Sequence, residues 1–219
     1  MKQMPDNMDY EGTAKILSQD PSPLNSVLLQ EMQRYNLLLD QIRDSLLSLE
    51  RGIQGLTVMT LDLEIIFTCI LDGRVPPLWG KTYPSAKPLA AWAKDLVNRV
   101  DLFDKWAASA RPPWVFWLSA FTFPSGFLTA VLQMAARQHQ VSVDSLTWEF
   151  IVQAVDDSNL TGPAKDGVYV KGFFLEGAGW DKKSAVLIEA SSVQLVVAMP
   201  TIQFKPVESR KKGTRRKKE

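Results

Sequence analysis

The sequence predicts an α+β fold in which helices come first and antiparallel strands follow. Up to about residue 111 the apolar residues recur at helical spacing, as in Leu28, Met32, Tyr35 and Leu39. Beyond about residue 140 they form short β-branched or aromatic runs that turn residues separate. Because helices precede strands instead of alternating with them, we expect no doubly wound nucleotide-binding sheet.

Residues 1–21 form a polar lead-in with one short helix expected around residues 10–17. The helical region is expected over residues 22–111 and starts at Pro21-Ser22-Pro23, a typical helix start. Its first helix is predicted over residues 24–51.

The apolar residues of this long helix follow an unbroken 4-3 spacing from Leu28 to Ile53, and Gly52 and Gly55 end the pattern. Such a stripe is typical of a coiled coil. Additional leucines widen it, which favours packing against several neighbours in the same protein over a partner helix; they are Leu29, Leu37, Leu38 and Leu47.

Two further helices are expected in this region. One runs over residues 58–71 and ends at Asp72-Gly73, after which Pro76 and Pro77 force an extended connection. The other begins at Leu89 and ends before Pro112.

Residues 112–204 are expected to hold a strand–corner–helix unit and an antiparallel sheet. The unit is a strand over 114–121, a Pro-Ser-Gly corner and a helix over 127–138. Strands are then predicted over 141–143, 146–152, 168–175, 185–189 and 193–204. Within them, residues 175–181 are expected to form a strand and its turn, with Trp180 as an anchor.

The charges are distributed unevenly. The protein has 219 residues, 25 Lys+Arg and 24 Asp+Glu, and residues 209–219 hold seven of the basic residues and one acidic residue. Subtracting these leaves a net charge of −5 for the body, which is not typical of a nucleic-acid-binding domain. Residues 205–219 are expected to form a disordered basic tail.

A membrane span is not expected. The stretch between Arg111 and Arg137 has no charge, but Pro124 and Gly126 interrupt it and polar residues dilute it. The N-terminus has no apolar run typical of a signal peptide. The single cysteine fits a reducing, intracellular compartment.

No metal or cofactor site is expected, because Cys69 is the only cysteine and His139 the only histidine. A Cys–His dyad is the one nucleophilic arrangement left open, but Cys69 lies in an apolar stretch where a thiol is typically a small buried side chain. Gly80-Lys81-Thr82 matches the end of a phosphate-binding loop, but Val75 stands where its first glycine is required.

Two pairs of carboxylates are possible acid–base groups, Asp156 with Asp157 and Glu176 with Asp181. The first pair lies in a sequence typical of a solvated loop. The seven tryptophans occur at core-like spacings without interleaved basic residues, which favours core packing over a stacking platform. We therefore expect no catalytic, cofactor-binding or metal-binding residue.

Six motifs in one order resemble the C-terminal region of dynein heavy chains, and they are closest to axonemal, inner-arm-type heavy chains. Two of them are Val75-Pro76-Pro77-Leu78-Trp79, continued to residue 89, and Leu175-Glu176-Gly177-Ala178-Gly179-Trp180-Asp181. The others lie at residues 28–36, 55–59, 116–124 and 127–137. Together they extend over residues 22–209.

The resemblance implies a segment that follows the sixth AAA+ module, with helices leading into an incomplete antiparallel β-barrel-like domain across one face of the motor ring. It implies no ATP site in the segment, although the parent heavy chain resembles a minus-end-directed microtubule motor ATPase. Family members continue with further strands beyond the equivalent of residues 199–204, so we expect a truncation before the last strands of the family domain.

The partners that the resemblance implies are the dynein AAA+ ring and, through the parent complex, intermediate and light chains. Microtubules are expected to be contacted only indirectly, and neither nucleic acid nor a membrane is expected. The expected location is the cytoskeleton of the cytoplasm, in the axoneme of a cilium or flagellum. The alternative function is an independent helical adaptor that dimerises through the 28–53 stripe and binds an acidic partner through its basic tail.

Overall fold

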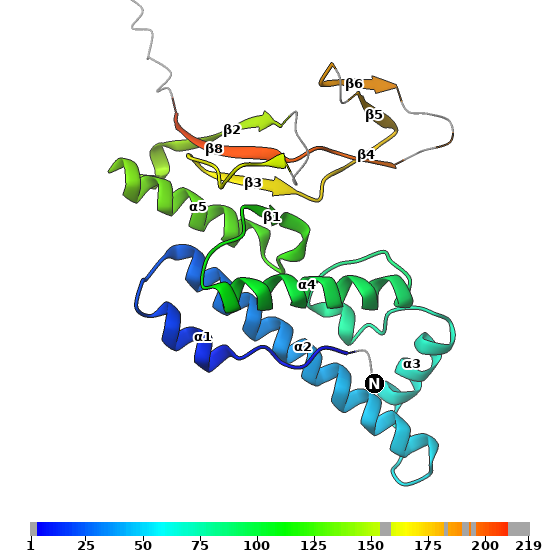
Figure 1. Ribbon diagram of the computed structural model, residues 1–219. Helices are drawn as coiled ribbons and strands as arrows, with labels where there is room; N and C mark the ends of the chain where they lie inside the picture. The colour runs from blue at the N-terminus through cyan, green and yellow to red at the C-terminus, as the bar shows by residue number, and fades with distance from the viewer. Residues whose placement is uncertain (1–3, 154–158, 182–183, 190–192, 194–195, 210–219) are drawn as a thin grey trace, which may run out of the picture. The chain divides into compact units, whose positions relative to one another are not determined.

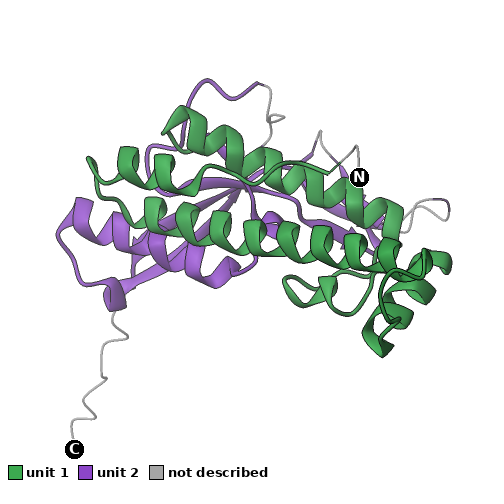
Figure 2. Ribbon diagram, turned by 90° about the horizontal axis from the view of Figure 1, so that it is seen from below, with its two compact units in different colours: residues 1–112 green, residues 113–219 purple. Residues whose placement is uncertain are grey.

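The computed structural model describes residues 4–153, 159–181, 184–189, 193 and 196–209. It confirms the mixed α+β class. The protein divides into two compact units, residues 1–112 and 113–219 (Figure 2). Each unit is described by itself.

Unit 1 is helical (Figure 1). Its elements are α1 (Tyr10–Leu17), α2 (Pro23–Ile53), α3 (Leu61–Leu71), a 3-10 turn η1 (Trp79–Lys81) and α4 (Leu89–Ser109). The expected helices at 10–17, 24–51 and from Leu89 are thus confirmed. The helix expected from residue 58 begins later, because the Thr60 hydroxyl caps it by accepting a hydrogen bond from the Leu63 backbone N–H at 3.4 Å.

The apolar stripe of α2 packs within unit 1. Leu28, Met32, Tyr35 and Leu39 are fully buried, and α2 contacts α1, α3 and α4. The prediction that the apolar stripe of α2 packs against neighbours in the same protein is therefore confirmed for these four residues. A dimer through the same residues would need to displace these neighbours, which disfavours the adaptor.

The polar lead-in is tied to α2 by a reciprocal amide pair. The Met8 backbone N–H donates to Asn36 Oδ1 at 2.9 Å, and Asn36 Nδ2 donates to the Met8 carbonyl at 2.8 Å. Asp9 caps α1 by accepting a hydrogen bond from the Gly12 backbone N–H. Residues 8–17 of the lead-in are thus part of the folded unit.

Unit 2 combines one long helix with short strands. Its elements are β1 (Val115–Trp117), η2 (Leu118–Ala120), α5 (Pro124–His139), η3 (Val143–Ser145), β2 (Leu146–Val152), β3 (Val168–Lys171), β4 (Phe174–Glu176), β5 (Ala178–Asp181), β6 (Val186–Glu189), β7 (Val196–Ala198) and β8 (Ile202–Glu208). Part of its core is an aromatic group of Phe116, Phe121 and Phe127, with the rings of Phe121 and Phe127 at a centroid distance of 4.4 Å.

The strands form three sheets. The largest has the order β1-β3-β8-β2, in which β1 is parallel to β3 and the other pairs are antiparallel. β4 pairs with β7, and β5 pairs with β6, both antiparallel. The described residues form no closed barrel.

The strand–corner–helix prediction needs correction. The expected strand 114–121 is three residues of β1 followed by the 3-10 turn η2. The expected corner is instead the first turn of α5, because Pro124 fits the first helical position, where its missing N–H costs no hydrogen bond.

Three strand boundaries are also corrected. Residues 141–143 form no strand, and η3 begins at Val143. The expected strand 168–175 is divided between β3 and β4 at Gly172, whose φ of +96° leaves the strand region. Residues 194 and 195 of the expected strand 193–204 lie outside the described residues, and the strand is interrupted between β7 and β8 at Pro200, which cannot donate to a strand ladder.

β8 extends to Glu208, so residues 205–208 belong to a strand and not to the tail. Leu146 pairs with Glu208 at one end of β2, and Lys205 Nζ lies 3.3 Å from Glu149 Oε2 across the same pair of strands. Cross-strand pairing with β2 thus orders residues that composition alone assigns to a solvated end. The basic residues 210–218 lie outside the described residues.

Candidate docking surface

A buried ion-pair cluster joins α2, α4 and the proline-rich connection in unit 1. Asp95 on α4 accepts hydrogen bonds from Arg99 Nε at 2.8 Å and from Lys87 Nζ at 2.7 Å. The guanidinium carbon of Arg99 lies 4.2 Å from the centroid of the Tyr83 ring. Since Asp95 and Arg99 are buried and mutually paired, each holds the other in one position.

The pKa values in this cluster follow from burial and pairing. Burial alone raises the pKa of Asp95, but the hydrogen bonds from Lys87 and Arg99 outweigh it and hold that pKa below the ordinary value. Burial alone lowers the pKa of Arg99, and its interactions with Tyr35 and Asp95 bring it above the ordinary value. Burial also raises the pKa of Tyr35 and of Tyr83. The cluster therefore keeps its charges at neutral pH.

An aromatic stack fixes the connection that precedes α4. Trp79 Nε1 donates a hydrogen bond to Ser45 Oγ on α2 at 2.9 Å. The ring of Trp92 stacks on those of Trp79 and Tyr83, with centroid distances of 6.3 and 5.7 Å. These two tryptophans are core residues, as their spacing predicts.

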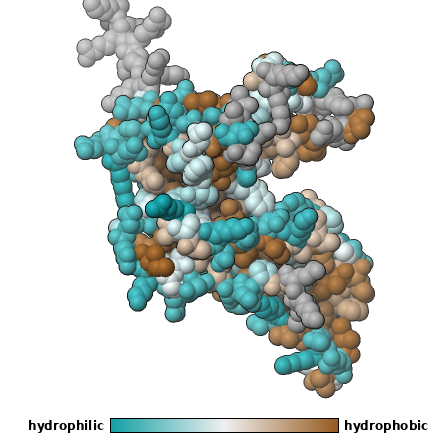
Figure 3. Space-filling view, in the orientation of Figure 1, coloured by the Kyte–Doolittle hydropathy of each residue, from teal (hydrophilic) through white to brown (hydrophobic). Residues whose placement is uncertain are grey.

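The helix α3 is apolar on nearly all sides but is covered on only one of them. Leu63, Ile66 and Cys69 are buried, whereas Leu61 and Leu71 are about 70% exposed. The loop before α3 adds Leu56 and Val58, which are 74% and 80% exposed. Hydrophobic residues gather over this end of unit 1, at the lower right of Figure 3. An exposed apolar patch of this kind is typical of a protein–protein contact.

A groove of about 830 Å³ lies beside this patch, between α2 and α3. One wall is a face of α2 that includes Leu37 and Asp44, and the other is the loop 56–60 with the start of α3. Its floor contains the buried Ile66. Three carboxylates line it, those of Asp40, Asp44 and Asp62.

Two features of the sequence indicate this surface, although the sequence-based prediction does not include it. Leu37, one of the leucines expected to widen the apolar stripe of α2, is exposed, and on the outer side of α3 the polar residues Glu64 and Thr68 are accompanied by exposed leucines. Apolar residues on the outer side of a helix favour a second cover.

The described residues that the sequence singles out for chemistry are distributed over both units. Cys69 is buried on α3, and His139 is the exposed last residue of α5, so the two belong to different units. Lys81 is exposed at the end of η1, a 3-10 turn and not a loop that leads from a strand into a helix. Among the described residues, no three His, Cys, Asp or Glu side chains form a group that could hold a metal ion.

Of the two carboxylate pairs that the sequence suggests, only one lies within the described residues. Asp156 and Asp157 lie outside the described residues. Glu176 is exposed at the end of β4, and Asp181 at the end of β5 accepts hydrogen bonds from the backbone N–H and hydroxyl of Ser184. Asp181 thus closes a turn in this structure.

The 175–181 segment is a strand, a turn and a second strand. Gly177 has a φ of +71° between β4 and β5. Trp180 is half-buried and lies opposite Leu187 in the β5–β6 pair. It is therefore a partial anchor and not a fully buried one.

None of the described helices combines the length and the hydrophobicity that a membrane crossing requires.

Comparison with known proteins gives one consistent result. The family described as the C-terminal domain of the dynein heavy chain matches residues 1–219. The sequence is 64% identical over 214 residues to dynein axonemal heavy chain 2 of Homo sapiens, and 46% identical over 212 residues to the dynein-1-beta heavy chain, flagellar inner arm I1 complex, of Chlamydomonas reinhardtii. These matches cover 98% and 97% of this protein.

A third relative, dynein axonemal heavy chain 12 of Mus musculus, is 39% identical over 208 residues, and the match covers 94% of this protein. The 219 residues span only 5 to 7% of the length of these three relatives.

Proposed function

The protein belongs to the family of C-terminal domains of dynein heavy chains, and from this membership we propose that it is a non-catalytic segment of an axonemal dynein heavy chain. In this role it packs on the AAA+ motor ring and supports the microtubule-based movement of cilia or flagella. Its place is then the axoneme. Its partners are the ring and, through the parent complex, the intermediate and light chains, and it contacts microtubules only indirectly.

The exposed apolar surface of α3 is the observation that carries this proposal. Leu61, Leu71, Leu56 and Val58 present large apolar side chains to solvent at one end of unit 1. Burying such side chains stabilises an interface by about 25 cal/mol per Å² of apolar area, so docking of this surface on a partner is favourable. A ring face offers a large surface for that docking.

The buried polar cluster supports a bracing role. Asp95, Arg99 and Lys87 link α4 to the connection before it, and Trp79 links that connection to α2. Unit 1 is thereby held as a stiff body, and a stiff body transmits strain better than a set of loosely packed helices. This is the physical property that a brace between ring modules needs.

For unit 2 we propose that its sheets are parts of an incomplete barrel. β2 pairs on one side only, with β8, and β4–β7 and β5–β6 are two-stranded among the described residues. Open edges of this kind are usually covered by further strands or by a partner. Exposed apolar residues on these strands, such as Phe174 and Leu187, favour such a cover.

A pulldown tests the proposed function. The 219-residue protein is mixed with a purified axonemal dynein motor ring that lacks its own C-terminal region, at low and high salt, and the ATPase rate of the ring is measured with and without it. We expect retention at both salt concentrations, because apolar contacts are not screened by salt, together with a changed ATPase rate. Loss at both, with folded and soluble input, would contradict the proposal.

The matched variants separate α3 from the rest of unit 1. Leu61→Asp with Leu71→Asp places two charges on the apolar surface of α3 and should abolish retention. Val97→Asp changes an exposed apolar residue of α4 and should leave retention unchanged.

A further inference from the structure

We infer that the groove between α2 and α3 binds a basic amphipathic helix of the motor ring. The inference rests on the proposed function and deepens it, since it names the chemistry of the segment that this part of unit 1 receives. The shape, the exposed apolar side chains and the unpaired charges of the groove each support it.

The shape of the groove fits a helix. Its α2 wall includes Leu37, Gln41, Asp44, Ser48 and Arg51, which are spaced 4-3-4-3 and so lie on one face of the helix. At 1.5 Å per residue this wall is about 21 Å long, the length of a helix of about four turns.

The walls also disfavour an extended strand as the occupant. Both are made of helix side chains and a loop, and neither offers a strand edge with which a strand could pair. A helix satisfies its own backbone hydrogen bonds and can lie in such a groove with its apolar face inward.

The apolar side chains around the groove are exposed on both sides of it. Leu37 on α2 is 63% exposed, and Leu56 and Val58 on the loop face solvent even more. Ile66 at the floor is already covered by unit 1 and is 2% exposed. A bound helix with an apolar stripe would cover Leu37, Leu56 and Val58 without displacing Ile66.

The charge of the lining is negative. Asp44 and Asp62 have no ion-pair partner in the described part of the protein, whereas Asp40 accepts from Arg43 Nη1 at 3.1 Å and from Asn7 Nδ2 at 2.8 Å. Arg51 is the one basic residue among the described lining residues, which leaves a net charge of −2. Charge complementarity therefore requires an occupant with Lys or Arg beside its apolar stripe.

Two other occupants fit less well. Residues 210–219, the basic end of this sequence, include no apolar side group and so cannot supply the stripe. A second copy that used the same groove would bring Asp44 and Asp62 toward the equivalent carboxylates, and like charges repel. A helix of the ring remains the occupant that matches both shape and charge.

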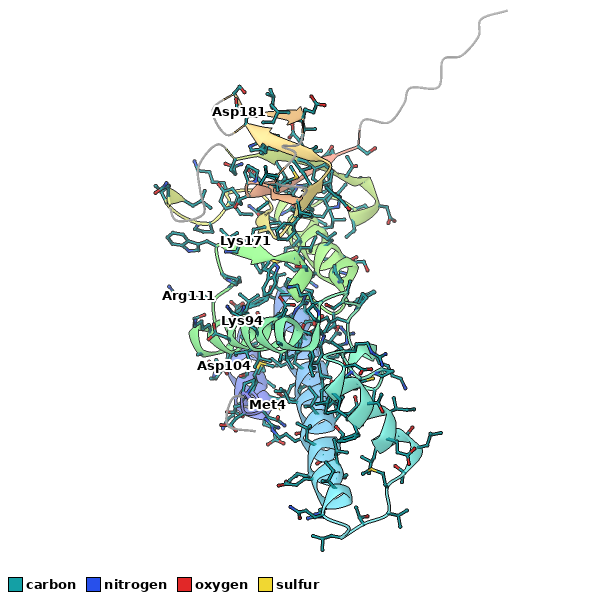
Figure 4. The ribbon with its side chains drawn as sticks, turned by 90° about the vertical axis from the view of Figure 1, so that its right-hand side faces the viewer. Met4, Lys94, Asp104, Arg111, Lys171 and Asp181 are labelled. Carbon is teal, nitrogen blue, oxygen red and sulfur yellow. The ribbon has the colours of Figure 1, made fainter. Side chains whose placement is uncertain are left out.

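The first test measures affinity. The fluorescently labelled 219-residue protein is titrated with the motor ring lacking its own C-terminal region, at two salt concentrations. Asp44→Lys with Asp62→Lys should weaken binding about tenfold at low salt, and less at high salt, where charges are screened. Asp104→Lys is the matched control, because Asp104 is an exposed carboxylate on α4 (Figure 4) and should change affinity less than about twofold.

The second test locates the occupant. A photoreactive side chain replaces Val58, and the cross-linked ring peptide is identified by mass spectrometry. We expect a helical segment with Lys or Arg beside an apolar stripe. This measurement does not need the charge-reversed variant to fold, so it decides the question if that variant is unstable.

The outcomes distinguish the two levels of the proposal. If the unmodified protein binds and the charge reversal does not weaken this binding, the inference is overturned and the proposed function stands. A cross-link to an acidic or non-helical segment has the same consequence. No binding by the folded, unmodified protein overturns both.

Discussion

Arg99 packs its guanidinium over the ring of Tyr83, with the guanidinium carbon 4.2 Å from the ring centroid. The same guanidinium donates to Asp95 through Nε. Arg99 is therefore held by an anion on one side and by an aromatic face on another. Tyr83 belongs to the connection that precedes α4, so this contact ties an irregular segment to a helix.

Asp95→Asn should destabilise the protein in a pH-dependent manner. The folded-state pKa of Asp95 lies below its ordinary value, so its contribution is fully present above the unfolded-state pKa of about 3.9 and is lost as the pH falls through the folded-state pKa. At pH 7 the variant should lose about 3 kcal/mol of unfolding free energy, because Arg99 remains buried without its anion.

Urea unfolding of wild type and variant between pH 7 and pH 3 measures this effect, with Asp104→Asn as the exposed control. The difference between wild type and Asp95→Asn should shrink as the pH approaches 3. A difference that stays constant over that range would show that the carboxylate charge is not what stabilises the cluster.

Gly167→Ala should destabilise unit 2 by about 2–5 kcal/mol. Gly167 has a φ of +73°, and a Cβ there would lie 1.9 Å from the Phe204 carbonyl oxygen on β8. Gly177→Ala is the matched control, since Gly177 has a φ of +71° but no atom within 4 Å of an added Cβ, and it should cost only about 1–2 kcal/mol. Thermal unfolding monitored by far-UV circular dichroism measures both, and equal losses would count against the close approach of β8.

Trp180→Ala should cost about 1–3 kcal/mol, less than the roughly 3–5 kcal/mol of a fully buried tryptophan. The reason is that Trp180 is half-buried and that its cross-strand neighbour Leu187 is itself exposed. The midpoint of chemical unfolding measures this loss. An unchanged midpoint would show that the β5–β6 pair contributes nothing to the stability of unit 2.

The isolated protein should not turn over ATP, and Lys81→Ala should have no effect on that result. Lys81 ends a 3-10 turn, and the backbone before it includes two prolines that have no N–H to donate to a phosphate. A coupled phosphate-release assay on the purified protein tests this expectation. Turnover that Lys81→Ala abolishes would establish a nucleotide site here.

The helices of unit 1 can be predicted from the sequence because their apolar spacing is a local property. The helix-start signal Pro21-Ser22-Pro23 and the 4-3 pattern from Leu28 together place α2 within two residues of its observed ends. In unit 2, by contrast, the breaks at Gly172 and Pro200 come from a left-handed glycine conformation and from a proline that cannot donate to a strand ladder, and apolar spacing shows neither of them. The strand predicted to end at residue 204 continues to Glu208, because pairing with β2 orders its last residues.

The candidate surface is harder to predict than the fold. Leu37 and Asp44 lie on one face of α2, but the groove exists only because α3 and the loop before it lie opposite that face. No spacing within α2 indicates this. Charge counts do not reveal the groove either, because they average Asp44 and Asp62 with basic residues elsewhere in the sequence.

The position of β8 has a consequence for synthesis on the ribosome. β8 lies between β3 and β2 in the sheet although both of these precede it in the sequence, and Leu146 has Glu208 as its partner. The largest sheet of unit 2 therefore cannot assemble until residues 202–208 have left the exit tunnel. Unit 1 holds its helix contacts within residues 1–112 and can fold before then. During that interval β2 has no partner strand and β3 can pair only with β1, so this is the stage of biogenesis at which a chaperone would protect the nascent polypeptide most.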